Sequence, residues 1–326
     1  MRILVVKTSS MGDLVHMLSA LREASDALPT MRIDWVCEEA FVDLPKLLPC
    51  VDEVIPVAMR RWRRQGLSAR TFAEIRAFVR RLRQTDYDRV IDAQGLLKSA
   101  WMTRLARCPR GGRWGYDWKS AREPLASLVL DHRVSAPSEW HAIERLRQLV
   151  KQALGLAEGG TIRCIDPPQD VASPSGSSPT ILLLHGTSRI EKSWPVPEWI
   201  DLGRRLASQG YRLELPWGSE AEHLQAEAIA QGIGEQAVVL DRLSIGELAR
   251  QCCVARGVIG LDSGLMHLSV ALGRPTVALM TGAHHARFSA QRFAPFWAPH
   301  ARVLVSQAEG SISAEMAFHA WQEVVR

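Results

Sequence analysis

The sequence predicts an α/β protein of two doubly wound domains, each built on a parallel sheet, that face one another across a cleft. Short apolar, β-branched runs alternate with segments of helical periodicity in both halves of the chain. A stretch rich in Gly, Pro and Ser at residues 157–179 separates the halves and is typical of a linker. The length of 326 residues suits two domains of ordinary size.

The first half opens with a continuous apolar run at residues 3–6, typical of a strand buried on both faces of a sheet. A polar loop follows, and a helix is expected from about Asp13, because apolar residues then recur at helical spacing. Further strands are expected at 32–37, 54–57, 89–92 and 112–115. Further helices are expected at 41–48, 71–84, 96–106 and 141–154, with a loop or short basic helix at 59–67.

The second half repeats the alternation. Strands are expected at 180–184, 212–215, 237–240, 257–261 and 275–280. Helices are expected at 197–209, 220–231, 245–253, 265–272 and 313–325. We therefore expect an N-terminal domain at 1–156 and a C-terminal domain at 180–310, joined by the linker at 157–179.

Composition limits the class of protein. No apolar run approaches the roughly 20 residues that span a bilayer, and the short apolar start lacks the architecture of a signal peptide. The six cysteines show no CxxC spacing, which is typical of buried thiols in a reducing compartment. No cluster of His, Cys or Asp has the spacing of metal ligands. These features predict a cytosolic protein without a bound metal.

The charge is unevenly distributed. From Arg60 to Arg83 there are nine arginines and a single acidic residue, Glu74. Such a block predicts an anionic partner: nucleic acid, a phosphorylated sugar or an anionic membrane surface. A solvated helix face is the alternative. The chain has no helix-turn-helix, zinc-finger or RRM signature, which disfavours nucleic acid.

Three loops of the second half follow predicted strands. The loop HGTSRIEKSW at 185–194 offers the hydroxyls of Thr187 and Ser188 and the charge of Lys192. The loop DSGLMH at 262–267 opens a helix, whose free N–H groups at Ser263 and Gly264 suit an anion. Each loop alone has an ordinary explanation, a helix N-cap or an exposed lysine.

The third loop, LPWGSEAE at 215–222, offers the flat face of Trp217 and the carboxylate of Glu222, which suits ribose hydroxyls. Together the three loops predict a nucleotide-diphosphate site at one sheet edge. The chain has no GxGxxG after its first strand and no GxxxxGK[ST], which argues against a Rossmann dehydrogenase and a P-loop NTPase.

Asp13 lies at the carboxyl end of the first predicted strand. Ligands of open α/β sheets bind at that edge, so a functional carboxylate is one interpretation. The other is a helix N-cap, a position that Asp, Ser and Thr favour.

Seven stretches resemble the ADP-heptose:lipopolysaccharide heptosyltransferase family of Gram-negative bacteria. In chain order, from Met1 to about Leu279, they are VKTSSMGDLVH, IPVAMRRWRR, VIDAQGLLKSA, AREPLAS, LLHGTSRIEKSWP, LPWGSEAE and GLDSGLMHLSVALGRPTVAL. The DSGLMH loop carries the similarity to the whole family. The first, the arginine-rich and the AREPLAS stretches resemble the member that adds the first heptose.

The resemblance implies an inverting glycosyltransferase of the GT-B fold. It implies transfer of L-glycero-D-manno-heptose from ADP-heptose to the first Kdo of Kdo2-lipid A, without a metal or other cofactor. It also implies a cytoplasmic enzyme, peripheral on the cytoplasmic face of the inner membrane, with no nucleic-acid partner. In such folds the last helix, here 311–326, crosses back to the first domain, and domain closure brings the base to the donor.

The resemblance also assigns roles to matching residues. Asp13 matches the general base, and Lys192 matches a catalytic residue of the donor side. The implied donor-binding residues are Thr187, Ser188, Lys192, Trp217, Glu222, Asp262, Ser263, Gly264 and His267. The implied acceptor-binding residues are Ser10, Gly12, Arg60, Arg61, Arg63, Arg64 and Arg122. Trp62, among these arginines, is expected at the headgroup level of a membrane. A packed core histidine remains the alternative for His267.

Other functions remain open on the residues alone. One is another heptosyltransferase of the same pathway, and one is a sugar-nucleotide epimerase on the same fold. The non-enzyme alternative is a basic nucleotide-binding module that contacts RNA or a membrane.

Overall fold

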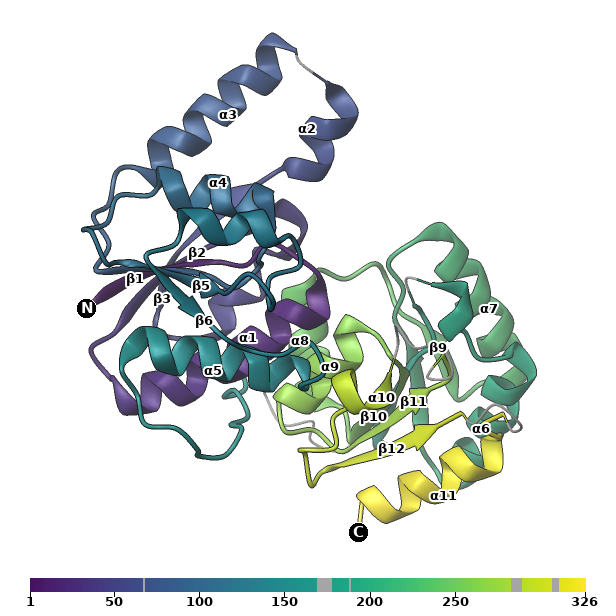
Figure 1. The fold of residues 1–326 in the computed structure, drawn as a ribbon. Helices are drawn as coiled ribbons and strands as arrows, with labels where there is room; N and C mark the ends of the chain where they lie inside the picture. Colours follow the sequence, from purple (N-terminus) through teal and green to yellow (C-terminus); the bar gives the residue numbers. More distant parts are fainter. Residues whose placement is uncertain (67, 169–177, 188, 283–288, 307–310) are drawn as a thin grey trace. The chain divides into compact units, whose positions relative to one another are not determined.

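The computed structural model describes residues 1–66, 68–168, 178–187, 189–282, 289–306 and 311–326. The chain divides into two compact units, Met1–Arg163 and Cys164–Arg326 (Figure 1). The division after Arg163 falls within the segment 157–179 that the sequence marks as a linker.

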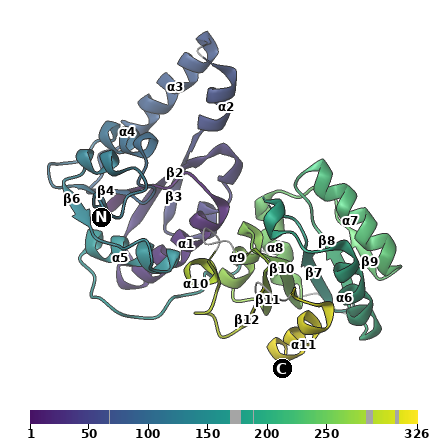
Figure 2. The ribbon, with the colours of Figure 1, turned by 45° about the vertical axis from the view of Figure 1, so that its right-hand side comes forward.

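The first unit is a parallel sheet between two helical layers. Its strands are β1 (Arg2–Val6), β2 (Arg32–Glu38), β3 (Val51–Val57), β4 (Arg89–Asp92), β5 (Arg113–Tyr116) and β6 (His132–Val134). Its α-helices are α1 (Met11–Ala27), α2 (Met59–Gln65), α3 (Ala69–Leu82), α4 (Leu97–Leu105) and α5 (Ala142–Leu154). Its 3-10 helices are η1 (Glu39–Phe41), η2 (Pro45–Leu47) and η3 (Pro124–Val129). Helices α3 and α4 cover one face of the sheet, and α1 and α5 lie side by side on the other (Figures 1 and 2).

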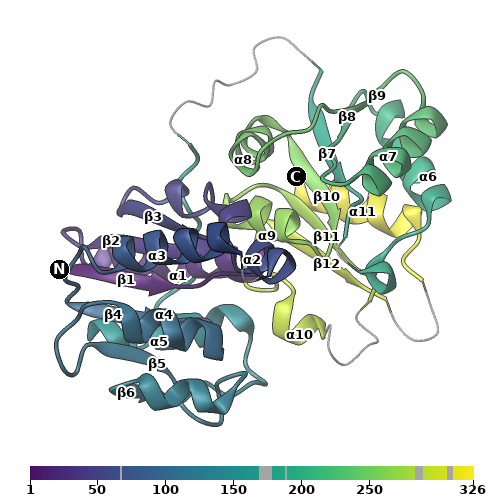
Figure 3. The same ribbon diagram turned by 90° about the horizontal axis from the view of Figure 1, so that it is seen from above.

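The second unit has the same architecture. Its strands are β7 (Thr180–Leu184), β8 (Arg212–Leu215), β9 (Ala237–Val239), β10 (Gly257–Leu261), β11 (Thr276–Met280) and β12 (Ala301–Val305). Its helices are η4 (Ile190–Lys192), α6 (Val196–Ser208), α7 (Glu220–Ile233), α8 (Ile245–Val254), α9 (Gly264–Ala271), α10 (Ala290–Phe293) and α11 (Ala314–Val324). Helices α6, α7 and α11 cover one face, and α8 and α9 the other (Figure 3).

Both sheets share one strand order, and this order locates the sites. The first sheet runs β3-β2-β1-β4-β5-β6, and the second runs β12-β11-β10-β7-β8-β9, which is the same order read from the other edge. In the part of the chain that the structure describes, each pair of neighbouring strands in the two sheets is parallel. The strand order reverses between β1 and β4 and between β7 and β10, and ligands of doubly wound sheets bind at that reversal. The predicted fold class, two doubly wound parallel sheets, is confirmed.

The central strands are apolar because helices cover both of their faces. All four residues after Arg2 in β1 are fully buried, as are Gly257 to Leu261 of β10. This burial explains why both strands are continuous apolar runs rather than alternating ones. A polar residue directly follows the last residue of each strand, Lys7 after β1 and Asp262 after β10, and the functional loops begin there.

Several elements differ from expectation. The helix expected at 41–48 is instead the two short 3-10 helices η1 and η2, because Pro45 has no backbone N–H and interrupts an α-helix. Helix α1 begins at Met11 rather than near Asp13. Within the described ranges, the structure adds five short elements that were not expected, η3, β6, η4, α10 and β12. The sequence of β6, His-Arg-Val, lacks the apolar run of the other strands.

The last helix belongs to the second unit. We expected residues 311–326 to cross back to the first domain, but α11 packs on α6, β11 and β12. Trp321 explains this packing, because its ring is fully buried in the apolar core of the second unit. Gly257 leaves room for that ring, since a Cβ at this position would lie 2.6 Å from Trp321 carbon atoms.

Trp321→Ala is expected to destabilise the second unit by about 3–5 kcal/mol, because it leaves a cavity the size of an indole in a close-packed core. Urea unfolding followed by circular dichroism measures the loss. Met316→Ala on the exposed face of α11 is the matched control, with an expected change within about 0.5 kcal/mol. Equal stability of the two variants would contradict the assignment of α11 to this core.

Candidate active site

Asp13 lies at the strand-order reversal of the first sheet, in the first turn of α1. Its Oδ2 accepts hydrogen bonds from the backbone N and from Oγ of Ser10, both at 2.9 Å. Ser10 is therefore the N-cap residue, and Asp13 is the third residue of the helix. The interpretation of Asp13 as the N-cap was wrong. Gly12 lies between them in the first turn, where its lack of a side chain leaves the backbone accessible.

Asp13 is paired with a buried lysine. Lys7, the first residue after β1, places Nζ 3.7 Å from Asp13 Oδ1, and its side chain is almost fully buried. Burial lowers the pKa of Lys7, and the charges of Asp13 and Asp92 oppose this shift. Burial raises the pKa of Asp13, but Lys7, the Ser10 hydrogen bonds and His16 outweigh it and hold that pKa below its usual value. Asp13 is thus an ionised carboxylate, able to accept a proton.

The pKa of Asp13 predicts the pH dependence of turnover. A lowered carboxyl pKa means that the base form is lost only as pH falls below the ordinary value of 3.8. Between about pH 5 and 8 we expect no acid limb in the kcat/KM profile that belongs to Asp13. Circular dichroism over the same range separates unfolding from protonation. An acid limb near pH 6 that shifts in Asp13→Glu would contradict this prediction.

The loop after β4 supports the loop after β1. Gln94 Oε1 accepts hydrogen bonds from the backbone N of Thr8 at 3.0 Å and of Ser9 at 3.1 Å. Asp92 accepts bonds from the N–H groups of Gln94 and Gly95 and from Ser99, which fixes the Gln94 side chain. Burial raises the pKa of Asp92, although these hydrogen bonds oppose the shift. The two loops thus form one rigid edge beside Asp13.

Three of the predicted acceptor arginines gather around one lysine. Lys98, in the first turn of α4, has its pKa lowered by burial and by the charges of Arg60, Arg63 and Arg122. Glu38, at the end of β2, opposes this shift. Arg122 also acts electrostatically on Lys7, so the cluster extends to the neighbourhood of Asp13. Four cations close enough to act on one another at this sheet edge have the charge that suits an anion.

Arg61 and Trp62 are held by acidic side chains. Arg61 donates to Glu39 at 3.1 Å and to Glu74 at 2.7 Å, and these hydrogen bonds raise its pKa. Trp62 Nε1 donates to the same Glu74 oxygen at 2.7 Å, and only 8% of Trp62 is exposed. The expectation of Trp62 at membrane headgroups was therefore wrong, because its ring packs with Phe78 in the core. Arg64 is exposed on α2.

The second unit carries a buried three-residue network at its own strand-order reversal. Asp262, directly after β10, receives Lys192 Nζ on Oδ2 at 2.5 Å and lies 3.2 Å from His267 Nε2 through Oδ1. Burial raises the pKa of Asp262, but His267 and Lys192 outweigh it and hold that pKa far below its usual range. Lys192 is positioned by η4, whose last carbonyl accepts a 2.6 Å hydrogen bond from Thr281. His267 is therefore buried and paired with Asp262, as either a donor-site residue or a core histidine would be.

Polar groups suited to an anion lie beside this network. Ser263 is the N-cap of α9, and its Oγ accepts from Met266 N at 3.3 Å. Helix geometry leaves the first N–H groups, from Gly264 on, without partners inside the helix. Thr187 Oγ1, in the loop after β7, is buried and has no hydrogen-bond partner among the residues that the structure describes. A buried unsatisfied hydroxyl is typical of a ligand site. Ser188 lies outside the described residues.

Glu222 and Trp217 lie beside the loop after β7. Glu222 Oε2 accepts from the N–H groups of Gly218 and Ser219 at the start of α7, while a Cβ at Gly186 would lie 2.8 Å from Oε1. Glycine at 186 therefore lets this carboxylate approach the β7 loop. Trp217 Nε1 donates to Leu240 O at 2.7 Å, which fixes the orientation of its ring.

Sequence reasoning missed the residues that support Asp13. The sequence does indicate a role for Lys7, because a lysine that directly follows a continuous apolar strand is expected to be buried and paired with an acidic residue. Gln94 and Lys98 lie in the VIDAQGLLKSA stretch after β4. Only the strand order, which places β4 beside β1, shows that these residues reach the loop of Asp13.

Comparisons of both sequence and structure with known proteins find heptosyltransferases. Residues 75–317 match the model of glycosyltransferase family 9, the heptosyltransferases. Lipopolysaccharide heptosyltransferase 1 of Pseudomonas aeruginosa is 45% identical over 284 residues, 86% of this chain and 78% of that protein. The protein of that name in Escherichia coli K12 is 42% identical, over 86% of this chain and 87% of that protein.

A solved structure of E. coli heptosyltransferase WaaC with ADP superposes with a TM-score of 0.88 at 36% identity, covering 99% of this chain and all of that one. The WaaC structure with ADP-2-deoxy-2-fluoro heptose gives a TM-score of 0.84 at 36% identity, covering 99% of both chains. The similarity covers both units, so the whole architecture, and not one domain alone, is shared with these proteins.

Proposed function

The chain belongs to glycosyltransferase family 9, the heptosyltransferases, and from this premise we propose the reaction and both substrates. It transfers L-glycero-D-manno-heptose from ADP-heptose to the first Kdo of Kdo2-lipid A, with inversion at the anomeric carbon. The observation that carries the proposal is an ionised carboxylate, Asp13, at the strand-order reversal of a unit that presents four cations nearby. The other unit carries an anion site at its own reversal.

The second unit binds the donor in this proposal. Lys192, the Thr187 hydroxyl and the first N–H groups of α9 hold the diphosphate, since cationic and N–H donors offset its charge. Asp262 keeps Lys192 in place and, with His267, orients the heptose hydroxyls. Glu222 accepts hydrogen bonds from the ribose, and Trp217 offers a flat face to the nucleoside. WaaC structures with ADP and with an ADP-heptose analogue support this assignment.

The first unit binds the acceptor and supplies the base. Asp13 accepts the proton of a Kdo hydroxyl as its oxygen attacks the anomeric carbon of the heptose. The bond from that carbon to the diphosphate breaks, and ADP leaves with the electron pair. A single displacement of this kind inverts the configuration. Lys7 keeps Asp13 ionised until the hydroxyl arrives, and Ser10 fixes its orientation.

The acceptor is recognised by charge. Kdo carboxylates and lipid A phosphates match Arg60, Arg63 and Arg122 with Lys98 at their centre. Arg64 extends this surface. Arg61, whose guanidinium donates to Glu39, Glu74 and Gln65, adds positive charge beside it. Ser10 and Gly12 border the base and contact the reacting sugar.

The enzyme acts without a metal ion and at the membrane surface in this proposal. The Lys192 ammonium and the α9 N-terminus supply the positive charge that a metal gives to a departing diphosphate in other enzymes. Among the described residues no helix has the length and apolarity needed to cross a bilayer. We therefore place the enzyme peripherally, on the cytoplasmic face of the inner membrane where its lipid acceptor lies.

The experiment is heptose transfer by the purified chain with EDTA present. ADP-heptose and Kdo2-lipid A are the substrates, and mass spectrometry measures the product. We expect one heptose added per acceptor, at a rate that Mg²⁺ does not change. Tight binding of ADP-heptose without transfer would agree with the proposed donor site and would overturn the proposal that Kdo2-lipid A is the acceptor. Transfer that EDTA abolishes and Mg²⁺ restores would overturn the metal-free mechanism.

A further inference from the structure

Helix α4 of the first unit exposes apolar side chains. Leu97 and Trp101 are among the large hydrophobic residues that the described part of the chain exposes to solvent. They are four residues apart, and Arg104 follows three residues later, so the three side chains share one face of the helix. Trp101 also stacks on Phe78 with ring centroids 6.1 Å apart, which fixes its position on the surface.

The segment η3 lies against α4 and extends this surface. Leu97 N donates to Glu123 Oε2 at 2.5 Å, and Glu123 N donates to Gly95 O at 3.1 Å, so the start of η3 is tied to the start of α4. On η3, Leu125 is 53% exposed and Leu128 is 65% exposed. Single exposed leucines are ordinary on protein surfaces, whereas four large apolar side chains on two adjoining segments form a patch.

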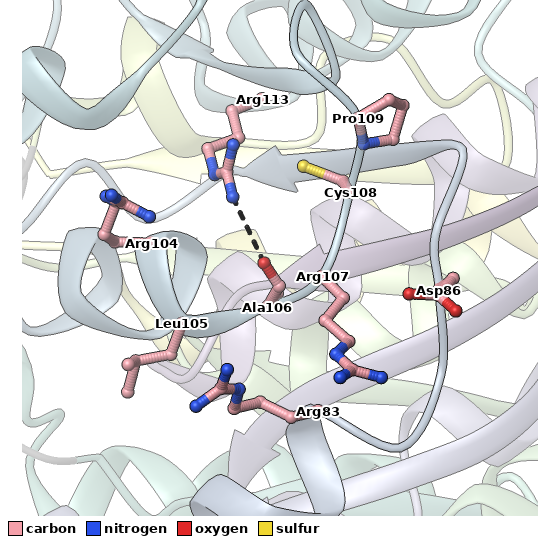
Figure 4. Close-up of a pocket in the computed structure, with 9 residues that line it drawn as sticks. All are labelled: Arg83, Asp86, Arg104, Leu105, Ala106, Arg107, Cys108, Pro109 and Arg113. Carbon is pink, nitrogen blue, oxygen red and sulfur yellow. Dashed lines mark hydrogen bonds between the residues drawn. The ribbon is translucent and has the colours of Figure 1, made fainter.

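A basic pocket adjoins one end of this patch. It holds about 580 Å³ and is lined by Arg83, Arg104, Arg107 and Arg113, with Asp86 as its acidic residue (Figure 4). Arg113 is fixed by a 3.2 Å hydrogen bond from Nη2 to Ala106 O. Arg104 belongs both to the pocket and to the exposed face of α4. The pocket is therefore continuous with the apolar patch.

The other end of the patch adjoins the acceptor cations. Lys98 follows Leu97 on α4, and Arg122 directly precedes Glu123 at the start of η3. Apolar side chains between two groups of cations complement a bilayer with anionic lipids, whose phosphates bind arginine while leucine and tryptophan enter the headgroup region. A protein partner that matched this surface would need acidic groups at both ends and an apolar centre.

We propose that the α4–η3 face, formed by Leu97, Trp101, Arg104, Leu125 and Leu128 with the adjoining arginine pocket, docks on an anionic phospholipid bilayer. The inference rests on the proposed function, because a lipid acceptor requires the enzyme at a membrane. It adds the surface that makes contact. This surface lies on α4 and η3 and shares only Arg83 with the arginine block of residues 60–83 that the sequence indicated. Docking through this face sets Lys98 and Arg122 beside the headgroups from which the acceptor sugars project.

The test is sedimentation of the full chain with vesicles of phosphatidylcholine, alone or with 30% phosphatidylglycerol. The wild type is expected to bind the anionic vesicles at least tenfold better, and high salt should weaken this binding. Leu125→Gln/Leu128→Gln should lower the partition coefficient on the order of tenfold. Arg83→Gln/Arg107→Gln should lower it to a similar extent and flatten its dependence on salt.

Matched controls lie in the second unit. Leu224→Gln replaces a leucine that is 59% exposed on α7, and Arg212→Gln/Arg326→Gln removes two exposed positive charges. Both should bind vesicles as the wild type does. Three results would each overturn the proposal. The Leu125/Leu128 double variant could bind anionic vesicles as tightly as the wild type, or the control variants could lose as much binding as the test variants. The third result is a wild type that binds neutral and anionic vesicles equally well.

Activity separates this inference from the proposed function. The Leu125/Leu128 variant should keep its kcat/KM toward a water-soluble, deacylated Kdo acceptor and lose about tenfold toward Kdo2-lipid A embedded in anionic vesicles. Equal activity on both acceptors would contradict docking through this face. If the wild type transferred heptose to neither acceptor, the proposed function would fail, and the vesicle measurements would still decide the docking surface.

Discussion

Asp13→Asn is expected to lower the turnover number for heptose transfer by a factor on the order of 10²–10⁴, the usual contribution of a general base. The amide is nearly isosteric with the carboxylate, and its Oδ1 still accepts from Ser10, so the start of α1 is preserved. What is lost is the ability to take the acceptor proton. Initial rates with saturating ADP-heptose and acceptor measure the effect.

Binding distinguishes the loss of a base from a loss of structure. Calorimetry should give the same affinity for ADP-heptose in Asp13→Asn and in the wild type, because the residues that we propose to bind the donor are all in the other unit. Asp26→Asn, near the end of the same helix and paired with Arg22, is the matched control and should keep full activity. Near-normal turnover of Asp13→Asn would contradict the role of Asp13 as the base. Asp13 would then serve only as the hydrogen-bond partner of Ser10 at the start of α1.

Lys192→Met is expected to give the second large effect, a loss of turnover on the order of 10²–10³ with weaker binding of ADP. The variant removes the cation that we propose to face the departing diphosphate. It also removes one of the two cationic partners of Asp262 and leaves His267, so the pKa of this buried carboxyl should rise. Turnover, ADP affinity and unfolding by urea together measure the consequences.

The double variant Lys192→Met/Asp262→Asn separates the two roles of Lys192. If Lys192 acts mainly by compensating Asp262, removing both charges should restore stability and ADP binding. If it contacts phosphate, stability recovers and ADP binding does not, and this second result is the one we expect. Lys192→Arg should keep much of the ADP affinity, because a cation remains. Normal ADP binding by Lys192→Met would contradict the diphosphate role.

The fold followed from patterns that burial imposes on sequence. The sequence predicts strands at β1 and β10 because helices cover both of their faces, so their buried residues are apolar. The strands at the edges of the sheets were harder to predict. β6 has three residues of mixed polarity, and its place is set by pairing with β5 rather than by its own composition. The prediction that the last helix returns to the first domain was wrong. The burial of Trp321 depends on space at Gly257, and no periodicity in the sequence shows that space.

The candidate site was predictable where one loop carried its own chemistry. Asp13, Lys192 and Asp262 each belong to a short polar stretch that follows a strand in the sequence, and the structure places them at the two strand-order reversals. Contacts between distant segments were not predictable. The ion pair of Asp262 with Lys192 joins residues 70 positions apart, and the bond of Gln94 to Thr8 spans 86 positions. Glu74, the single acid of the arginine block, proved to organise Arg61 and Trp62.

Acceptor choice tests the central claim most directly. The purified chain is given ADP-heptose with equal amounts of Kdo2-lipid A and of Kdo2-lipid A that already carries one heptose, and mass spectrometry follows both acceptors. We expect one heptose to be added to the first acceptor and none to the second, because the cations around Lys98 are proposed to hold Kdo carboxylates beside Asp13. Transfer only to the heptosylated acceptor would identify a different heptosyltransferase of the same pathway, and conversion of ADP-heptose to an isomer without transfer would identify an epimerase.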